Sequence, residues 1–131
     1  MKKKLIWVID DDAIYQRIIN KLIQKSGVFS ALSSFTNGKE AIVALNNSLD
    51  NNDSIPDIIL LDINMPVMDG WEFMEEIKNI KSKINKKIII YIVSSSIAIE
   101  DKNKSKTFTD IIGYIPKPIT VTDLLSFVSE E

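Results

Sequence analysis

The chain has 131 residues, close to the roughly 150 residues of one typical domain, so we expect a single folded unit. Hydrophobic residues make up 45% and charged residues 26% of it, which are ordinary proportions for a globular domain and exclude intrinsic disorder. The 16 basic and 18 acidic residues give a net charge of −2. No global basic field therefore exists to attract nucleic acid or anionic lipid.

The chain contains no cysteine and no histidine. This excludes Ser-His-Asp and Cys-His catalysis, thiolate zinc sites, haem ligation by these residues and a role as a phosphohistidine donor. The remaining carboxylates, amines and hydroxyls suit hard cations such as Mg²⁺, and phosphoryl or acyl transfer. The apolar runs at 5–9 and 88–93 are too short for a signal peptide or a membrane span. We therefore expect a cytoplasmic protein that binds neither nucleic acid nor membrane.

Short β-branched runs alternate with longer amphipathic stretches five times, which is typical of βα units around a parallel sheet. In chain order, strands are expected at 5–9, within 28–35, at 58–61, at 88–93 and from 113. Helices are expected after residues 12, 38 and 70, within 99–108 and over 120–129, with a solvated polar loop at 46–53. The pattern predicts an α/β fold with a doubly wound parallel sheet, because the third strand is apolar throughout and must be covered on both faces.

Polar side chains follow four of these strands. Asp10 and Asp11 follow the first strand, Asp62 the third, Ser94 the fourth and Lys117 the fifth. Parallel strands joined by right-handed crossovers share one carboxyl edge, where ligands bind. Clustered carboxylates repel one another unless a cation neutralises them, and Mg²⁺ prefers a few carboxylates together with carbonyl oxygens, waters and a phosphate. The sequence therefore predicts a magnesium site at this edge, with a lysine available for a phosphoryl oxygen.

Four motifs in this order resemble the receiver domain of two-component response regulators, in its stand-alone, chemotaxis-regulator-like form. They are VIDDD at 8–12, LLDINMPVMDG at 60–70, VSSS at 93–96 and GYIPKP at 113–118. The resemblance covers essentially the whole chain. It implies a flavodoxin-like fold with five strands in the order 2-1-3-4-5, and a single receiver domain over residues 1–131 with no effector domain.

The resemblance also implies a role for each matching acidic position. Asp62 would be the carboxylate that accepts a phosphoryl group from a partner's phosphohistidine, forming an acyl phosphate. Asp11 would bind Mg²⁺ directly and Asp10 largely through water, while Asp62 and the backbone carbonyl of Asn64 would complete the protein's share of the ligands.

The remaining matches concern the residues that would bind the phosphoryl group or change position in response to it. Lys117 would pair with Asp62 and then with the phosphoryl group, and Ser94 would supply the switch hydroxyl. Tyr114 matches the switch aromatic, which changes position as that hydroxyl closes on the phosphate and shifts the face formed by the fourth helix, fifth strand and fifth helix. The Lys117–Pro118 bond matches the family's cis position. The chain departs from the common pattern in its lysine-rich fourth helix and its longer loop at 46–53.

The implied phosphoryl donor is a sensor histidine kinase or a histidine phosphotransfer protein, and the implied output is a contact with a downstream protein. Homodimerisation on phosphorylation is compatible with the resemblance. Such a protein is no enzyme beyond its own phosphoryl transfer to Asp62 and autodephosphorylation. One alternative is a small Mg²⁺-dependent phosphohydrolase with an aspartyl nucleophile, which needs a second aspartate where this chain has Asn64. Another is a degenerate receiver that binds partners without phosphorylation.

Two further aspartates have structural interpretations. Asp12 is expected to cap the first helix. Asp57 precedes the third strand and therefore lies at the opposite edge from Asp62. We expect Asn64 and Ser96 to influence the lifetime of a phosphoryl group, and we place Trp7, Trp71 and Phe73 in the core.

Overall fold

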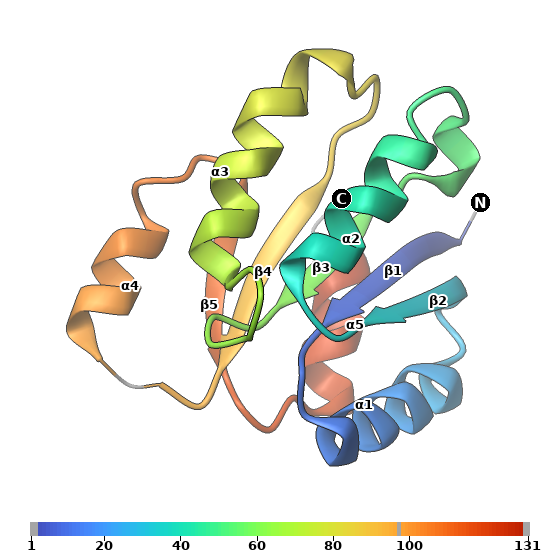
Figure 1. The fold of residues 1–131 in the computed structure, drawn as a ribbon. Coiled ribbons are helices and arrows are strands. Elements are labelled where there is room, and N and C mark those ends of the chain that lie inside the picture. Colours follow the sequence, from blue (N-terminus) through green and yellow to red (C-terminus); the bar gives the residue numbers. More distant parts are fainter. Residues whose placement is uncertain (1–2, 97, 130–131) are drawn as a thin grey trace.

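A computed structural model describes residues 3–96 and 98–129. Five parallel strands form one sheet in the order β2-β1-β3-β4-β5, as Figure 1 shows. They are β1 (Lys4–Ile9), β2 (Phe29–Phe35), β3 (Ile58–Leu61), β4 (Ile89–Ser94) and β5 (Ile111–Pro116). The predicted flavodoxin-like fold and its strand order are confirmed. The ends of the predicted domain, residues 1, 2, 130 and 131, lie outside the described residues.

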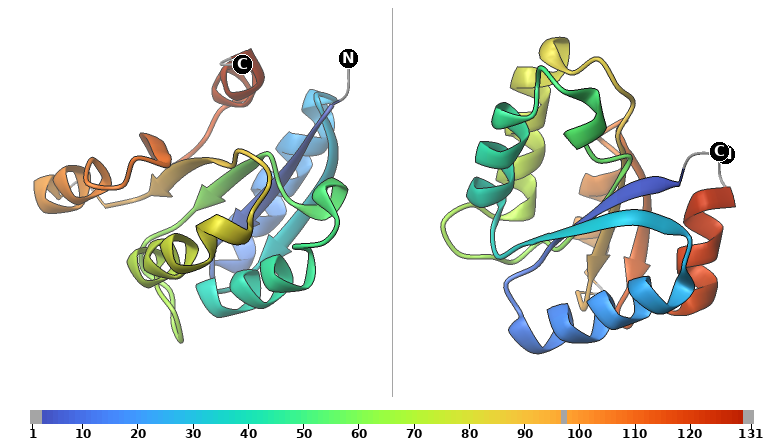
Figure 2. Two further views of the ribbon diagram at one scale, coloured as in Figure 1. Left: turned by 90° about the horizontal axis from the view of Figure 1, so that it is seen from above. Right: turned by 90° about the vertical axis from the view of Figure 1, so that its right-hand side faces the viewer.

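Within the described residues, five helices flank the sheet. They are α1 (Ala13–Ser26), α2 (Gly38–Asn47), α3 (Gly70–Ile80), α4 (Ile99–Ser105) and α5 (Val121–Ser129), with short 3₁₀ turns η1 (Asn52–Ser54) and η2 (Lys81–Lys83). Helices α1 and α5 lie on one face and α2 and α3 on the other, while α4 lies beside β5 at the edge (Figures 1 and 2). None of the helices within 3–96 and 98–129 has the length and apolar character needed to span a lipid bilayer.

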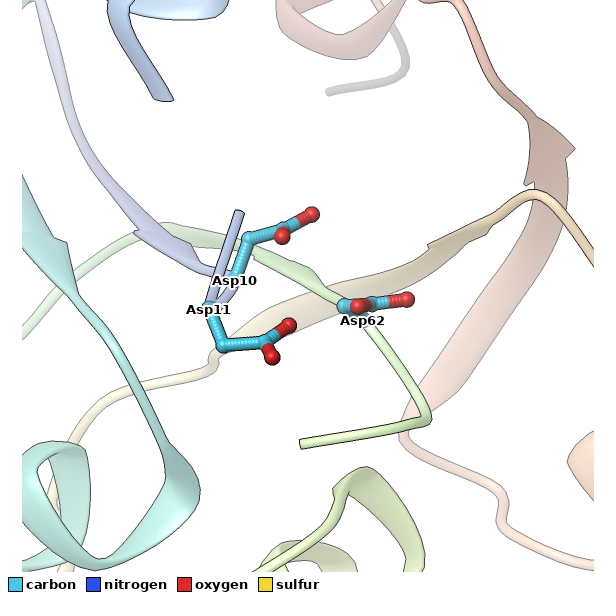
Figure 3. A group of neighbouring side chains, drawn as sticks. All are labelled: Asp10, Asp11 and Asp62. Atoms are coloured by element: carbon cyan, nitrogen blue, oxygen red, sulfur yellow. The ribbon is translucent and has the colours of Figure 1, made fainter. Parts of the chain in front are cut away.

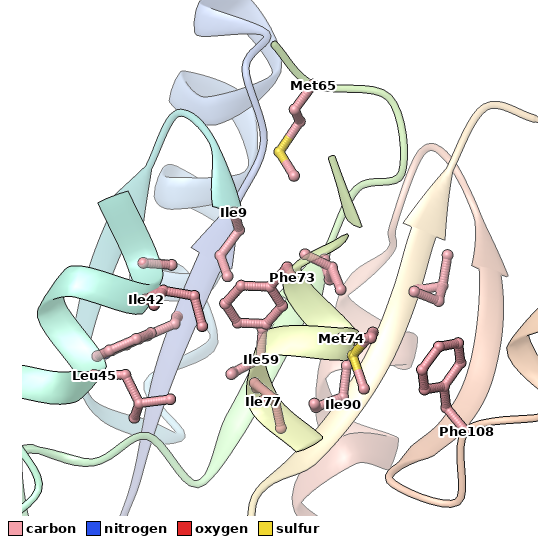
Figure 4. Packing of buried hydrophobic residues seen from close by; sticks show 14 of the residues in the cluster. Ile9, Ile42, Leu45, Ile59, Met65, Phe73, Met74, Ile77, Ile90 and Phe108 are labelled. Atoms are coloured by element: carbon pink, nitrogen blue, oxygen red, sulfur yellow. The ribbon is translucent and has the colours of Figure 1, made fainter. Parts of the chain in front are cut away.

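The three central strands β1, β3 and β4 are buried over most of their length, and their side chains alternate between the two faces of the sheet. In β3, Ile59 and Leu61 pack in the cluster under α2 and α3, which Figure 4 shows, whereas Ile58 and Leu60 pack in the cluster under α1 and α5. All four are at most 2% exposed. Successive side chains of a strand point to opposite faces, so the uninterrupted apolar run IILL is what a doubly covered strand requires.

The largest boundary differences from the sequence predictions are in β5 and α2, while β1, β4 and α5 are shifted by a single residue at one or both ends. Strand β5 begins at Ile111, two residues before the predicted start, because Ile111 already pairs with Ile90 of β4. Helix α2 continues to Asn47, into the stretch predicted to be loop. Ser48 then ends the helix, its hydroxyl donating to the carbonyl of Ala44 at 2.8 Å. Polar residues at a helix end can thus bond to its backbone instead of breaking it earlier.

Asp57 lies at the amino end of β3, opposite the edge that carries Asp62, as predicted. Its carboxylate accepts a hydrogen bond from the backbone N–H of Leu5 at 2.7 Å and lies 3.1 Å from the Lys86 ammonium. The same ammonium donates to the carbonyl of Ile55 at 2.6 Å. Asp57 therefore joins the starts of β1 and β3 to the loop before β4, which is a structural role.

We expect Asp57→Ala to lower the free energy of unfolding by about 1–3 kcal/mol, because the Leu5 N–H and the Lys86 ammonium lose their carboxylate partner. Denaturant unfolding followed by circular dichroism measures this. The surroundings of Asp62 should be unchanged in this variant, since the two carboxylates lie at opposite ends of one strand. An unchanged unfolding free energy would contradict the structural role.

Candidate functional site

The carboxyl edge of the sheet brings three carboxylates together. Asp10 follows β1 and Asp62 follows the neighbouring β3, and the Asp62 N–H donates to the carbonyl of Ile9 at 2.9 Å. Asp10 is 2% and Asp62 8% exposed, whereas Asp11 lies on the surface. One carboxylate oxygen from each of the three lies within 4.8 Å of the others, and Figure 3 shows their arrangement. The predicted acidic cluster therefore forms.

The loop from β1 into α1 holds Asp10 in place. The N–H of Asp12 donates to Asp10 Oδ1 at 2.9 Å, while the Asp12 side chain caps α1 by accepting from two N–H groups of its first turn. Gln16, buried in α1, donates from its amide to the carbonyls of Asp10 at 2.9 Å and Phe35 at 3.1 Å. The predicted cap is confirmed. The sequence does not single out Gln16 as a residue near the site, since a lone glutamine in an amphipathic helix usually faces solvent.

The loop from β3 into α3 is fixed by Gly70. Its N–H donates to the carbonyl of Ile63 at 2.8 Å, and a Cβ at this position would collide with the backbone carbonyl oxygen of Asp62. Only glycine permits so close an approach. Asp69 caps α3 in a reciprocal capping box with Glu72, which anchors the other end of the loop. The side chain of Asn64 is exposed at the start of this loop.

Lys117 is the one ammonium that the described residues place within 4 Å of these carboxylates. Its Nζ lies 2.7 Å from Asp10 Oδ2 and 3.9 Å from Asp62 Oδ2. Its backbone N–H donates to the carbonyl of Ser94 at 3.1 Å, and the Lys117–Pro118 bond is cis, as the resemblance implied. The lysine is therefore closer to Asp10 than to the Asp62 partner expected from the resemblance. Asp10 is the more deeply buried of the two carboxylates.

Burial raises the pKa of Asp62 to about 6, and the negative charges of Asp10 and Asp11 act in the same direction. The Lys117 ammonium and the N–H of Ile63, which donates to Asp62 Oδ1 at 2.9 Å, oppose the shift without cancelling it. The edge is thus short of positive charge when all three carboxylates are ionised. An all-oxygen group of this kind fits a hard divalent cation such as Mg²⁺.

The predicted switch residues are linked through Ser96. Ser94 is buried at the end of β4, and its Oγ accepts from the N–H of Ser96 at 3.0 Å. The carbonyl of Ser96 accepts from the hydroxyl of half-buried Tyr114 at 3.0 Å, and its own hydroxyl donates to Asp101 in α4 at 2.8 Å. Ser96 therefore contacts Ser94, the hydroxyl of Tyr114 in β5 and helix α4. Asp101 was not singled out by the sequence.

In metal-free buffer at pH 7.5, Asp62→Asn should have a higher free energy of unfolding than the wild type, by up to about 3 kcal/mol. The pKa of Asp62 is higher in the folded chain than its usual value of 3.8. The folded state therefore holds this proton more tightly, and stability is lost as pH rises through the window from about 4 to 6. Asparagine does not ionise, so the difference should shrink toward pH 4. Urea unfolding at several pH values tests this, and equal stability at pH 7.5 would contradict it.

Comparisons with known proteins agree with the observed fold. The chain matches the response regulator receiver domain over residues 6–129. It is 30% identical to a two-component response regulator from Cytophaga hutchinsonii of known structure, with a TM-score of 0.88 and coverage of 99% of this chain and 97% of that one. It is also 30% identical to the phosphorylated cyanobacterial phytochrome response regulator RcpA, with a TM-score of 0.76 and coverage of 98% and 90%.

Among curated proteins, the chain is 27% identical over 128 residues to the DNA-binding transcriptional regulator NtrC of Salmonella typhimurium. That alignment covers 98% of this chain but only 24% of the relative, so the chain spans about a quarter of NtrC. The domain match extends across nearly all of the described residues. This chain therefore belongs to the response regulator receiver domain family of two-component signalling.

Proposed function

We propose that this chain is a phosphorylation-activated receiver in which Asp62 accepts a phosphoryl group from a histidine kinase or a histidine phosphotransfer protein. The observation that carries the proposal is the convergence of Asp10, Asp11, Asp62 and Lys117 at one sheet edge. The likeness to RcpA, whose structure is that of a phosphorylated response regulator, supports it. The output is a contact with a protein partner in the cytoplasm, and a phosphorylated homodimer is one form of that contact.

Asp62 is the carboxylate best suited to act as nucleophile. Its Oδ1 accepts a hydrogen bond from Ile63, while its Oδ2 lies 3.9 Å from the nearest ammonium. Attack by Oδ2 on the donor's phosphorus forms an O–P bond and breaks the P–N bond to the donor's imidazole, which leaves with the electron pair and takes up a proton. The chain has no histidine, so the phosphoryl group must come from outside it.

We assign Asp10, Asp11, Asp62 and the backbone carbonyl of Asn64 as the groups that would hold Mg²⁺. When bound, the cation would neutralise negative charge on the transferring phosphoryl group. The fit is supported by the three carboxylate oxygens that lie within 4.8 Å of one another. Burial and the negative charges of Asp10 and Asp11 raise the pKa of Asp62, and a bound cation would offset those charges.

Lys117 and Ser94 would bind the transferred group. The Lys117 ammonium already lies between Asp10 and Asp62, so a small movement brings it to a phosphoryl oxygen. The Ser94 hydroxyl can turn to donate a hydrogen bond to another oxygen, because a hydroxyl rotates to suit its partner. Both groups add positive charge or hydrogen-bond donors where negative charge increases.

Acetyl phosphate and Mg²⁺ should add about 80 Da to the intact protein, the mass of one PO₃H unit. Mass spectrometry measures the gain, which should disappear in Asp62→Asn and with EDTA, and should fall strongly in Asp11→Ala because one metal ligand is lost. Asp57→Asn, at the other end of β3, is the matched control and should be phosphorylated normally. A gain that persists in Asp62→Asn, or steady hydrolysis of unrelated phosphomonoesters, would contradict the proposal and favour the phosphohydrolase alternative.

We further propose that phosphorylation alters the face formed by α4, β5 and α5. When Ser94 turns toward the phosphoryl group, it can no longer remain bonded in the same way to Ser96, which also contacts Tyr114 and Asp101. The face carries exposed apolar side chains, including Ile112 of β5 and Leu125 of α5, which suit a protein partner. Movement of Ser96 would thus change both Tyr114 and the start of α4.

Hydrogen–deuterium exchange of the phosphorylated protein tests this coupling. We expect altered exchange in peptides that cover 98–105 and 111–116 on phosphorylation of the wild type, because the bonds through Ser96 rearrange. Ser94→Ala removes the hydroxyl but keeps Asp62, so it should still accept the phosphoryl group and show much smaller exchange changes. Equal changes in both proteins would contradict the role of Ser94.

A further inference from the structure

The ammonium of Lys117 has an aromatic neighbour in addition to its carboxylate partners. Its Nζ lies 4.4 Å from the centroid of the Tyr15 ring, in the first turns of α1. The ring packs against the hydrophobic cluster under α1 and α5, so core residues hold it in place. An ammonium at this distance from an aromatic ring is attracted by the negative charge of the ring face.

We propose that Tyr15 is a positioning residue that holds the Lys117 ammonium at the site and so sets the rate at which Asp62 is phosphorylated. The inference rests on the proposed function. The lysine stem has four rotatable methylene groups, while its backbone is fixed by the hydrogen bond to the Ser94 carbonyl at 3.1 Å. The ring restricts where the end of this stem can lie, because moving away from it forfeits the attraction and exposes the ammonium to competing water.

The arrangement matters because two carboxylates compete for one ammonium. Asp10 holds it at 2.7 Å and Asp62 at 3.9 Å, so a productive shift toward the phosphoryl group must be short. The Lys117 side chain is only 17% exposed, with the Tyr15 ring as one of the surfaces that cover it. Without the Tyr15 ring, the Lys117 side chain gains conformational freedom, and its ammonium spends less time near the reacting oxygens.

The ring, and not the hydroxyl, carries this role. The Tyr15 hydroxyl is buried and makes no hydrogen bond within the described part of the chain. Burial raises the pKa of the phenol, and the charges of Asp10, Asp62 and Asp123 raise it further, so the side chain stays neutral. Tyr15→Phe should therefore keep the ring contact and also remove a buried polar atom that lacks a partner. Tyr15→Leu should lose the contact.

The experiment compares the wild type with Tyr15→Phe and Tyr15→Leu, using acetyl phosphate as the donor. At saturating donor, Tyr15→Leu should be phosphorylated about 2- to 30-fold more slowly, the range that a cation–π contact represents. The donor concentration at half-maximal rate and the Mg²⁺ affinity should be unchanged, because Tyr15 contacts neither. Tyr15→Phe should react at the wild-type rate. If the Tyr15→Leu protein does not fold, Tyr15→Met serves as a second variant without the ring.

A spectroscopic signature tests the contact separately from the rate. In NMR spectra, the ε-methylene protons of Lys117, assigned by their absence in Lys117→Gln, should show an upfield ring-current shift in the wild type and in Tyr15→Phe, but not in the ring-free variants. Tyr91→Leu is the matched control, since Tyr91 lies in the same cluster and stacks on Phe127 at 4.2 Å. It should lose stability without losing the Lys117 shift or the phosphorylation rate relative to folded protein.

Three results would overturn the inference while leaving the proposed function intact: a wild-type rate in the ring-free variants, an equal loss of rate in Tyr15→Phe and Tyr15→Leu, or no Lys117 shift in the wild type. A wild-type protein that takes up no phosphoryl group would instead overturn the proposed function, and this inference with it.

Discussion

The ion pair between Lys117 and Asp10, at 2.7 Å, is the interaction on which the site depends. Pairing β1 with β3 forces Asp10 and Asp62 next to each other, and Asp11 adds a third carboxylate at the same edge. A carboxylate that is buried without a cation beside it favours its protonated form. One ammonium offsets only part of this negative charge. The uncompensated charge is the basis of the proposals that a divalent cation binds at this edge and that Asp62 reacts there.

Several parts of this arrangement can be read from the sequence because they follow from chain connectivity. An apolar run such as IILL fits a doubly covered strand, and a residue that directly follows a parallel strand must lie at the carboxyl edge. Asp10, Asp62, Ser94 and Lys117 are placed in this way, and the structure finds all four at that edge. The strand order came from the resemblance, since alternating βα units alone allow more than one order.

Contacts that depend on side-chain direction could not be predicted. Gln16 and Tyr15 occupy neighbouring positions of α1. Only the rotation of the helix relative to the sheet places Gln16 beside the Asp10 carbonyl and Tyr15 beside Lys117. The link from Ser96 to Asp101 depends on how the loop after β4 meets α4. The preference of Lys117 for Asp10 over Asp62 is likewise a matter of about one ångström, which no spacing rule resolves.

Strand β3 ends in a carboxylate at each extremity, and each carboxylate faces a lysine from a distant segment. At one end, Lys86 also donates to the carbonyls of Ile55 and Asn52, at 2.6 and 3.2 Å, so these two carbonyls and the Asp57 carboxylate match its three N–H donors. At the other end, the recorded partners of the Lys117 ammonium are two carboxylates and a ring face. The same pair of residue types thus forms a fixed structural contact at Asp57. At Asp62 the lysine has fewer hydrogen-bond acceptors among the described residues, which is what the proposed transfer of its ammonium to an incoming phosphoryl group requires.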